Sequence, residues 1–484
     1  MKKIVLGLTI IIFIFLSACS TDDSTAIPRD LKLNYFVWNG LNNYYLWQED
    51  VSNLADDRFV DQNQLNGFLR GYPNPADLFN SLLYQKGTVD RFSVIYSDYT
   101  VLEQVLTGNN KNNGVDFGLL KKSANSDQVI GWVRYILPNS DASNKDIHRG
   151  DLFYAVDGTP LTIQNYQALL AAESYTLNMA DYDNGNYTPN GHSVSLTKYD
   201  YSENPVYYSD VYEINSNRIG YLVYNGFYGA YDVELNNHFA NFQAQGVTDL
   251  VLDLRYNSGG LVSTATHLAS MITGQFSGEI FARQQWNSKI TQVFENSDRE
   301  EELINRFSDK LGNGEQINHL NLNKVYVLTT SSTASASELV INGLKPYINV
   351  IQIGGTTTGK NVGSVTLYDS PNFGSNNKNP DHKYAMQPLT LKIVNNAGFG
   401  DYQLGLAPDI SVSENLGNMK PLGDVNELFL ATAISEITGM SAPRPFSEEG
   451  QHLQQISDSK KLIPMKTEMY LDEAPQGLLN LINN

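Results

Sequence analysis

A serine in the setting of a nucleophile lies within residues 333–338, which read Thr-Ala-Ser-Ala-Ser-Glu. This segment follows an apolar run at 325–328, predicted to be a strand, and opens a predicted helix over 336–344. At such a junction the unpaired N–H groups and the positive end of the helix dipole face any oxyanion that forms at Ser335. The simpler interpretation is a well-capped helix, because Ser335 and Glu338 satisfy the S-x-x-E capping box.

A serine hydroxyl is a weak nucleophile at neutral pH and needs a base close to it. None of the seven histidines lies in a G-x-S-x-G setting, and the zinc-protease motif H-E-x-x-H does not occur in the sequence. Lys360 is the remaining candidate, because it ends a Gly/Thr-rich stretch that follows an apolar run at 350–353. Burial there would favour the neutral amine that a general base requires. The alternative is an ordinary solvated loop lysine.

The elements that would position these residues alternate between strand and helix over 205–440. Apolar strands are predicted at 219–223, 250–254, 325–328 and 350–353, and helices at 230–245, 262–272 and 336–344. Nearly continuous apolar strands separated by helices indicate a sheet that is buried on both faces, an α/β architecture.

Four motifs in this order resemble the carboxyl-terminal processing (tail-specific) protease family, whose members are Ser/Lys endopeptidases. They are L-D-L-R-Y-N-S-G-G at 252–260, T-A-S-A-S-E at 333–338, G-G-T-T-T-G-K at 354–360 and G-L-A-P-D-I at 405–410. Lys360 follows Ser335 by 25 residues, as in that family. The implied catalytic core is a ClpP/crotonase-like β-sheet with flanking helices, joined to a PDZ-like β-rich domain and a small N-terminal helical domain.

The resemblance also implies roles for individual residues. Lys360 would take the proton from Ser335, whose Oγ would attack a peptide carbonyl and form an acyl-enzyme, with no metal or other cofactor. The oxyanion hole would consist of the N–H groups of Gly259 or Gly260 and of Ala336. The PDZ-like region would capture a free C-terminus or an extended chain through a loop formed by Val115, Asp116, Phe117 and Gly118.

The chain departs from the family pattern around its lysine. Many members carry a glutamine four residues after the lysine, where this chain has Ser364, and some carry an acidic residue where it has Pro346. Ser364, or a group elsewhere, is therefore the predicted partner that orients Lys360. Glu338 matches a glutamate of the family and is a second candidate for a supporting role, beside its role as a helix cap.

The N-terminus predicts export and a lipid anchor. Two lysines precede a thirteen-residue apolar run at 4–16, which is the length of a signal-peptide core and too short to span a membrane comfortably. The run ends in Leu-Ser-Ala before Cys19, which resembles the lipobox of bacterial lipoproteins. We therefore expect an exported lipoprotein of the cell envelope, held by a lipid on Cys19 at the outer membrane and facing the periplasm or the outside. An ordinary secretory signal with an incidental cysteine is the alternative.

Composition excludes several classes of function. The 484 residues include 52 acidic and 33 basic side chains, for a formal charge of −19. A nucleic-acid binder needs a cationic surface, so nucleic acid is not an expected partner. Cys19 is the only cysteine, which excludes disulfides within this chain and zinc–thiolate sites. The expected partners are polypeptide substrates.

The sequence divides into six predicted regions. These are a signal peptide at 1–18, a tether at 19–28, an N-terminal helical domain at 29–102, a PDZ-like domain at 103–200, a protease core at 205–440, and a polar tail or short packed extension at 441–484. Two other functions fit the same sequence: a catalytically silent lipoprotein that binds peptides or other ligands on this fold, and a lipoprotein for nutrient capture or surface scaffolding.

Overall fold

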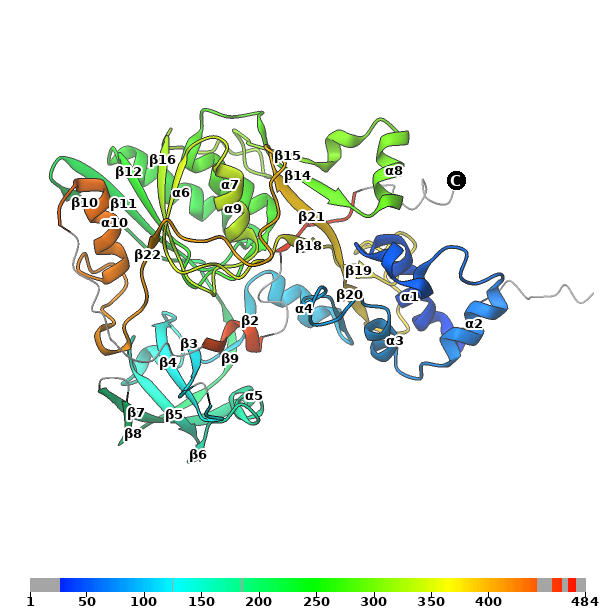
Figure 1. The fold of residues 1–484 in the computed structure, drawn as a ribbon, viewed down its shortest axis with the longest axis horizontal. Helices are drawn as coiled ribbons and strands as arrows, with labels where there is room; N and C mark the ends of the chain where they lie inside the picture. Colours follow the sequence, from blue (N-terminus) through cyan, green and yellow to red (C-terminus); the bar gives the residue numbers. More distant parts are fainter. Residues whose placement is uncertain (1–26, 124, 184–185, 442–454, 464–468, 476–484) are drawn as a thin grey trace, which may run out of the picture.

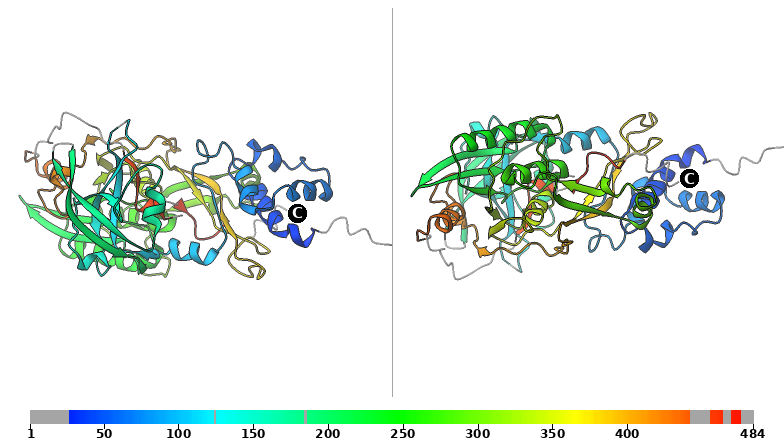
Figure 2. Two further views of the ribbon diagram at one scale, coloured as in Figure 1. Left: turned by 90° about the horizontal axis from the view of Figure 1, so that it is seen from below. Right: turned by 90° about the horizontal axis from the view of Figure 1, so that it is seen from above.

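The computed structural model describes residues 27–123, 125–183, 186–441, 455–463 and 469–475. The predicted signal peptide, Cys19 and most of the tether lie outside these residues. Figures 1 and 2 show an elongated molecule with the N-terminal helices at one end and two sheet-containing parts at the other. Within the described ranges, no helix is long and apolar enough to cross a membrane.

The N-terminal part is helical, and its helices begin at capping side chains. It contains α1 (Lys32–Tyr44), α2 (Gln62–Arg70), α3 (Pro75–Ser81) and α4 (Tyr99–Leu106). The carboxylate of Asp61 accepts a hydrogen bond from the N–H of Gln64, and Asn74 caps α3 just before its first-turn proline. Apolar residues of α1, among them Phe36 and Leu41, are buried in the main core of the protein.

The β-rich domain is an antiparallel sheet that closes over its own apolar cluster. Its strands are β3 (Val115–Lys121), β4 (Val129–Ile136), β5 (Leu152–Val156), β6 (Thr159–Pro160), β7 (Ser174–Asp183) and β8 (Asn186–Thr197), with α5 (Tyr166–Ala171) beside them. The turn Asp157-Gly158 joins β5 to β6, with φ of 48° and 75°. The four residues predicted as a peptide-binding loop, 115–118, instead begin strand β3, because they pair with β4.

The α/β core contains a six-stranded sheet whose two faces carry different side chains. Its order is β10 (Val206–Ile214), β11 (Asn217–Tyr224), β12 (Asp249–Asp253), β16 (Lys324–Thr329), β17 (Asn349–Gly354) and β22 (Ile410–Ser411), parallel except for β10. Leu222, Leu252 and Val327 pack into one apolar cluster. Their chain neighbours, such as Tyr221 and Val251, pack into another on the opposite face, as the alternation of a strand requires.

Helices cover both faces of this sheet, as the sequence predicts. The first face holds α6 (Asp232–Ala244), α7 (Val262–Thr273) and α9 (Ala336–Leu344), and the second holds α10 (Leu428–Thr438). Figure 1 shows α6, α7 and α9 together and α10 on the far side of the strands. The start of α9 thereby lies at the carboxyl end of β16, where ligands bind in α/β sheets.

A second sheet extends from the core toward the N-terminal helices. Its order is β13 (Gly260–Leu261), β24 (Met469–Tyr470), β18 (Val362–Ser364), β21 (Leu389–Asn395), β14 (Ile280–Trp286) and β15 (Ile304–Arg306), and α8 (Ser288–Asn296) follows β14. A three-stranded sheet of β1 (Val94–Tyr96), β20 (Ala385–Gln387) and β19 (Leu367–Tyr368) joins N-terminal residues to the core. A two-stranded pair, β2 (Asn109–Asn112) and β9 (Tyr199–Ser202), links the ends of the β-rich domain.

The described part of the C-terminal extension packs against two other regions. Strand β23 (Gln455–Asp458) pairs with β3 of the β-rich domain, and β24 pairs with β13 and β18 of the core. In Figure 1 this red segment lies between the β-rich domain and the core. The extension therefore shares sheets with both of its neighbours.

Arg255 joins the end of β12 to the start of α10 through a fully buried ion-pair network. Its guanidinium donates to Asp253 at 2.7 Å and to Glu427 at 2.8 Å. Glu427 also caps α10 by accepting a hydrogen bond from the N–H of Leu430. All three side chains are buried; Asp253 relies on Arg255 as its cation, whereas Glu427 also lies 3.9 Å from the guanidinium of Arg149.

Replacement of Arg255 by alanine should lower the free energy of unfolding by about 3–5 kcal/mol, because it leaves Asp253 buried without its cation and removes the nearer of the two cations at Glu427. Urea denaturation followed by circular dichroism measures the change. Arg299→Ala is the matched control: its partner Glu302 is 44% exposed, so its loss should cost about 0–1 kcal/mol. Equal effects of the two substitutions would contradict this account.

Candidate active site

Ser335 lies at the first turn of α9 in a backbone conformation that is rare for a residue with a side chain. Its φ is 65° and its ψ is −119°. Such strain is stored at functional sites when the surrounding structure enforces it. The side chain is fully buried, and its Oγ has no hydrogen-bond partner within the described part of the chain.

The carboxylate of Glu338 enforces this conformation from one turn into the helix. Its Oε2 accepts hydrogen bonds from the N–H of Ser335 and the N–H of Lys360, both at 2.8 Å. Its Oε1 accepts from the N–H of Gly359 at 2.7 Å and from Thr357 Oγ1. We call residues 330–335, between β16 and α9, the serine turn, and residues 355–361, between β17 and β18, the lysine loop. One buried carboxylate therefore holds the serine turn and the lysine loop side by side.

Burial has the largest influence on the pKa of Glu338. Desolvation raises the pKa of this carboxyl above its ordinary value, while the four donated hydrogen bonds act in the opposite direction. Glu338 has its predicted capping role, because its carboxylate accepts a hydrogen bond from the backbone N–H of Ser335. The same carboxylate also binds the lysine loop, so the helix cap and the link to Lys360 are one structure.

The loop after β12, residues 254–259, which we call the oxyanion loop, packs Gly259 directly against Ser335. A Cβ atom added to Gly259 would lie 2.7 Å from Ser335 Oγ, and the φ of Gly259 is 110°. Asn257 fixes this loop: its Oδ1 accepts the N–H of Gly259 at 2.9 Å, and its carbonyl accepts the N–H of Ala334 at 3.1 Å. Gly259 N–H can therefore serve a predicted oxyanion hole only after its bond to Asn257 breaks.

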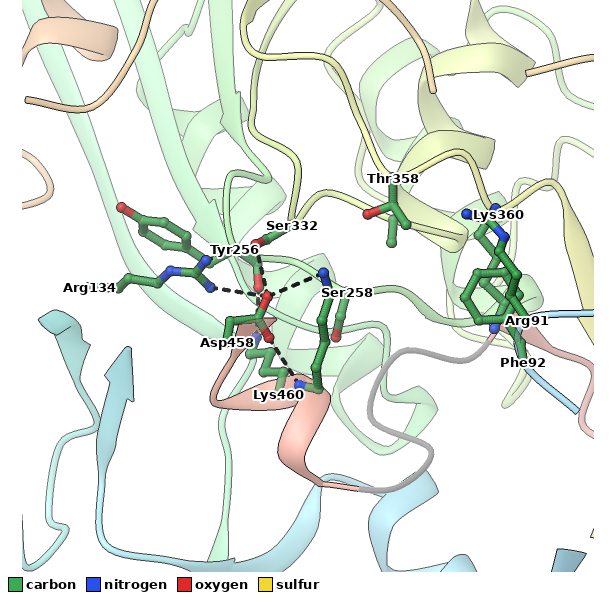
Figure 3. Close-up of a pocket in the computed structure, with 12 residues that line it drawn as sticks. Arg91, Phe92, Arg134, Tyr256, Ser258, Ser332, Thr358, Lys360, Asp458 and Lys460 are labelled. Carbon is green, nitrogen blue, oxygen red and sulfur yellow. Dashed lines mark hydrogen bonds and ion pairs between the residues drawn. The ribbon is translucent and has the colours of Figure 1, made fainter. Parts of the chain in front are cut away.

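Lys360 is fully buried beneath residues that come from the N-terminal part of the chain. Its Nζ lies 4.4 Å from the centroid of the Phe92 ring, and Arg91 donates to the carbonyl of Gly359 at 2.7 Å. Figure 3 shows Arg91 and Phe92 against Lys360. The face of this ring packs against the end of the lysine side chain, so the contact helps to fix the position of Nζ.

Ser364, the predicted partner of the lysine, is buried on β18. Its Oγ bonds the carbonyl of Met469 at 3.3 Å and Gln387 Oε1 at 3.5 Å. Gln387 lies on β20 and is itself 1% exposed. A glutamine side chain thus reaches this region from another strand, although the chain lacks one four residues after Lys360.

A cavity of about 230 Å³ opens beside these groups (Figure 3). Its walls come from the oxyanion-loop residue Ser258, the serine-turn residue Ala334, the base candidate Lys360 and the C-terminal residues Asp458 and Lys460. Figure 3 shows Arg134 and Asp458 on one side of the cavity and Lys360 on the other. Within the described ranges, no group of three or more His, Cys, Asp or Glu side chains is arranged to hold a metal ion.

The structure brings Ser335, Ala336, Glu338, Lys360 and Gly259 into one site. Sequence analysis missed four other contributors. Asn257 and Thr357 lie inside recognised motifs, and their polar side chains at tight turns are a signal that points to a bracing role. Phe92 and Gln387 lie outside the motifs. Only the fold brings Phe92 to Lys360 and Gln387 to Ser364.

Replacement of Glu338 by alanine should lower the free energy of unfolding by about 3–5 kcal/mol, because it leaves buried donors without an acceptor. Glu338→Gln keeps the shape and one acceptor oxygen, so a smaller loss is expected. Chemical denaturation of both variants tests this. An alanine variant as stable as the parent would show that the carboxylate does not hold the two loops.

The raised pKa of Glu338 also gives a pH dependence with a defined sign. A carboxyl whose pKa is higher in the folded chain stabilises it most below the ordinary value of 4.5, and this contribution is lost as pH rises through the raised pKa. The stability advantage of the parent over Glu338→Gln should therefore shrink as pH rises from 4. Unfolding free energies of both proteins across this range measure it, and an advantage that grew with pH would contradict the assignment.

Comparisons with known proteins agree with this geometry. The family model "Peptidase family S41" matches residues 218–412, and the model "Peptidase S41 N-terminal domain" matches residues 32–94. A CtpA-like serine protease of Staphylococcus epidermidis is 26% identical over 202 residues, 42% of this chain and 35% of that protein. A carboxyl-terminal-processing protease of Picosynechococcus is 27% identical over 173 residues, 35% of this chain and 36% of that protein. The matched region thus spans about a third of the length of these curated relatives.

A solved structure gives the fold over a larger share of the chain. A crystal structure from Bacteroides fragilis, described as an S41 protease, has a TM-score of 0.64 and 24% identity. It covers 84% of this chain and 97% of that one, so the similarity extends well beyond the segment shared with the curated relatives. The two family matches together span more than half of the residues and include the serine turn, the lysine loop and the oxyanion loop. The chain belongs to peptidase family S41.

Proposed function

We propose that this protein is a serine endopeptidase that cleaves peptide bonds in exported polypeptides, which it recognises by a free C-terminus or an unfolded segment. The observation that carries the proposal is the shared carboxylate of Glu338, which binds the backbone N–H groups of both Ser335 and Lys360. A nucleophile and its base must keep a fixed mutual position, and this is the arrangement that provides one.

The proposed mechanism uses only groups of this chain. Lys360 Nζ accepts the proton of Ser335 Oγ as the oxygen attacks the peptide carbonyl. The carbonyl oxygen becomes an oxyanion, which accepts hydrogen bonds from Ala336 N–H at the start of α9 and from Gly259 or Gly260. Lys360 then gives its proton to the leaving amine, and water hydrolyses the acyl-enzyme by the same route.

The substrate class rests on the charge and setting of the cavity. Five of its lining side chains are basic and one is acidic, although the whole chain carries a formal charge of −19. A basic cavity beside the nucleophile suits the carboxylate of a chain terminus. The predicted signal peptide and Cys19 support an exported, lipid-anchored protein of the cell envelope. The silent binding lipoprotein predicted as an alternative is not favoured, because Ser335 and Lys360 are both present and their backbone N–H groups share the carboxylate of Glu338.

Residues 20–484, which include all the described residues, should degrade casein, and Ser335→Ala and Lys360→Ala should each reduce the rate at least a thousandfold. Both variants remove groups that act in the same step, so their effects should not add. Gel electrophoresis and mass spectrometry of the fragments measure cleavage. Cleavage that survives in both variants would overturn the assignment of the site.

Gly259→Ala should abolish cleavage, because the new Cβ would lie 2.5 Å from Ser335 Cβ and 2.7 Å from its Oγ. Gly278→Ala is the matched control, since Gly278 has a φ of 87° and no atom within 4 Å of an added Cβ. Both substitutions place alanine at positive φ, but only the first crowds the nucleophile. An active Gly259→Ala variant would show that the oxyanion loop does not contact the reacting serine during catalysis.

A further inference from the structure

The edge of the β-rich domain is occupied by the C-terminal segment of the same chain. Strand β23 lies antiparallel to β3, with Gln455 opposite Leu120 and Asp458 opposite Gly118. Strand β3 has β4 on its other side, so β23 takes the position of an added outer strand. Addition of a strand to a sheet edge is a general way in which domains capture extended peptides.

Side chains of the segment fill a groove beside this edge. The N–H of Ser459 donates to the carbonyl of Phe117 at 2.8 Å, and Ser459 Oγ donates to Asp116 at 2.7 Å. Ile456 and Leu462 pack against the apolar core of the β-rich domain. Leu462 also lines a cavity of about 160 Å³, together with residues of β3 and α5.

The same segment is hydrogen-bonded to the serine turn and to the oxyanion loop of the candidate active site. The Oδ2 of Asp458 accepts from Ser332 Oγ at 2.9 Å, three residues before the nucleophile. Lys460 Nζ donates to the carbonyl of Tyr256 at 2.9 Å, three residues before Gly259. Both side chains are buried, and Figure 3 shows them at the cavity that also contains Lys360.

Residues 469–471 occupy a second backbone edge of the site. Met469 and Tyr470 pair in parallel with Gly260 and Leu261, the two residues that follow Gly259. The N–H of Leu471 donates to the carbonyl of Ser364 at 3.1 Å, on the strand that follows Lys360. A polypeptide that lay across Ser335 and used the edge at Gly260 would meet Met469 there.

We propose that the C-terminal segment, residues 455–463 and 469–471, is a built-in competitor of polypeptide substrates. It occupies the strand-addition edge of β3 and the edge at Gly260, and a substrate must displace it before cleavage. This inference rests on the proposed protease function for its effect on turnover. The docking of the segment on β3 stands independently and is tested by binding.

A disulfide that locks β23 onto β3 tests the effect on turnover. Residues 20–484 contain no cysteine, so Gln455→Cys with Leu120→Cys supplies one reversible pair at opposed positions. With the bond formed, casein cleavage should fall at least tenfold below that of the reduced protein and return on reduction. The two single-cysteine variants are controls that should not respond to reductant. Unchanged cleavage with the bond fully formed would overturn the proposal.

A release variant acts in the opposite direction. Ile456→Asp with Leu462→Asp places two charges in the apolar groove and should raise casein cleavage at least tenfold. Ile163→Asp is the control, because Ile163 is an exposed isoleucine of the same domain. Misfolding would lower activity in both the locked and the release variants, so it cannot imitate opposite responses. A release variant no faster than the Ile163→Asp control would count against the competitor role.

Binding separates this inference from the proposed function. A fluorescein-labelled peptide of residues 455–463, QISDSKKLI, should bind the release variant at least tenfold more tightly than the parent, whose own segment competes at high effective concentration. Fluorescence anisotropy measures this without any cleavage, and Ser335→Ala can be added to exclude turnover. Tighter binding without cleavage by any variant would retain the docking and reject the protease. Equal binding to parent and release variant would reject the docking.

Discussion

The buried carboxylate of Glu338 is the interaction on which the candidate site depends. Four donors from two segments converge on its two oxygens, which offsets the cost of removing an anion from water. A carboxylate suits this place because it only accepts hydrogen bonds, whereas an amide would present two N–H donors to backbone N–H groups. Ser335 follows β16 and Lys360 follows β17, and these two strands are adjacent and parallel. Their loops therefore share an edge of the sheet, and this carboxylate sets their mutual position.

Parts of the chain that lie outside the α/β core contact the candidate site from two sides. Phe92 and Arg91 cover Lys360 from the N-terminal side, and Asp458 and Lys460 bond the serine and oxyanion loops from the C-terminal side. A core cut at its predicted borders would lose both sets of contacts. The same cut would also divide the sheets that contain β1 and β24, because each is built from segments assigned to different predicted regions.

The sequence predicted the α/β core well because periodicity and motifs are local properties. Strands 250–254 and 325–328 are nearly continuous apolar runs, and the serine turn follows from a strand end and a capping pattern. The roles of Phe92, Gln387 and Asp458 were beyond prediction because they arise from contacts between residues far apart in the chain. Residues 115–118 form a strand rather than a loop, because pairing with β4 and β23 stabilises extended backbone at these positions.

An internal competitor with two attachment points selects substrates by length. The segment is tethered to the molecule, so its effective concentration at β3 is on the order of millimolar, and a short peptide that reaches only one edge competes poorly. An unfolded polypeptide can add a strand to β3 and also extend to the edge at Gly260, where it gains backbone hydrogen bonds at both places. The buried ion pair of Asp458 with Arg134 must be broken in the exchange, which makes displacement cooperative rather than gradual. A protease of this design remains closed to folded proteins and small peptides and opens to long flexible chains.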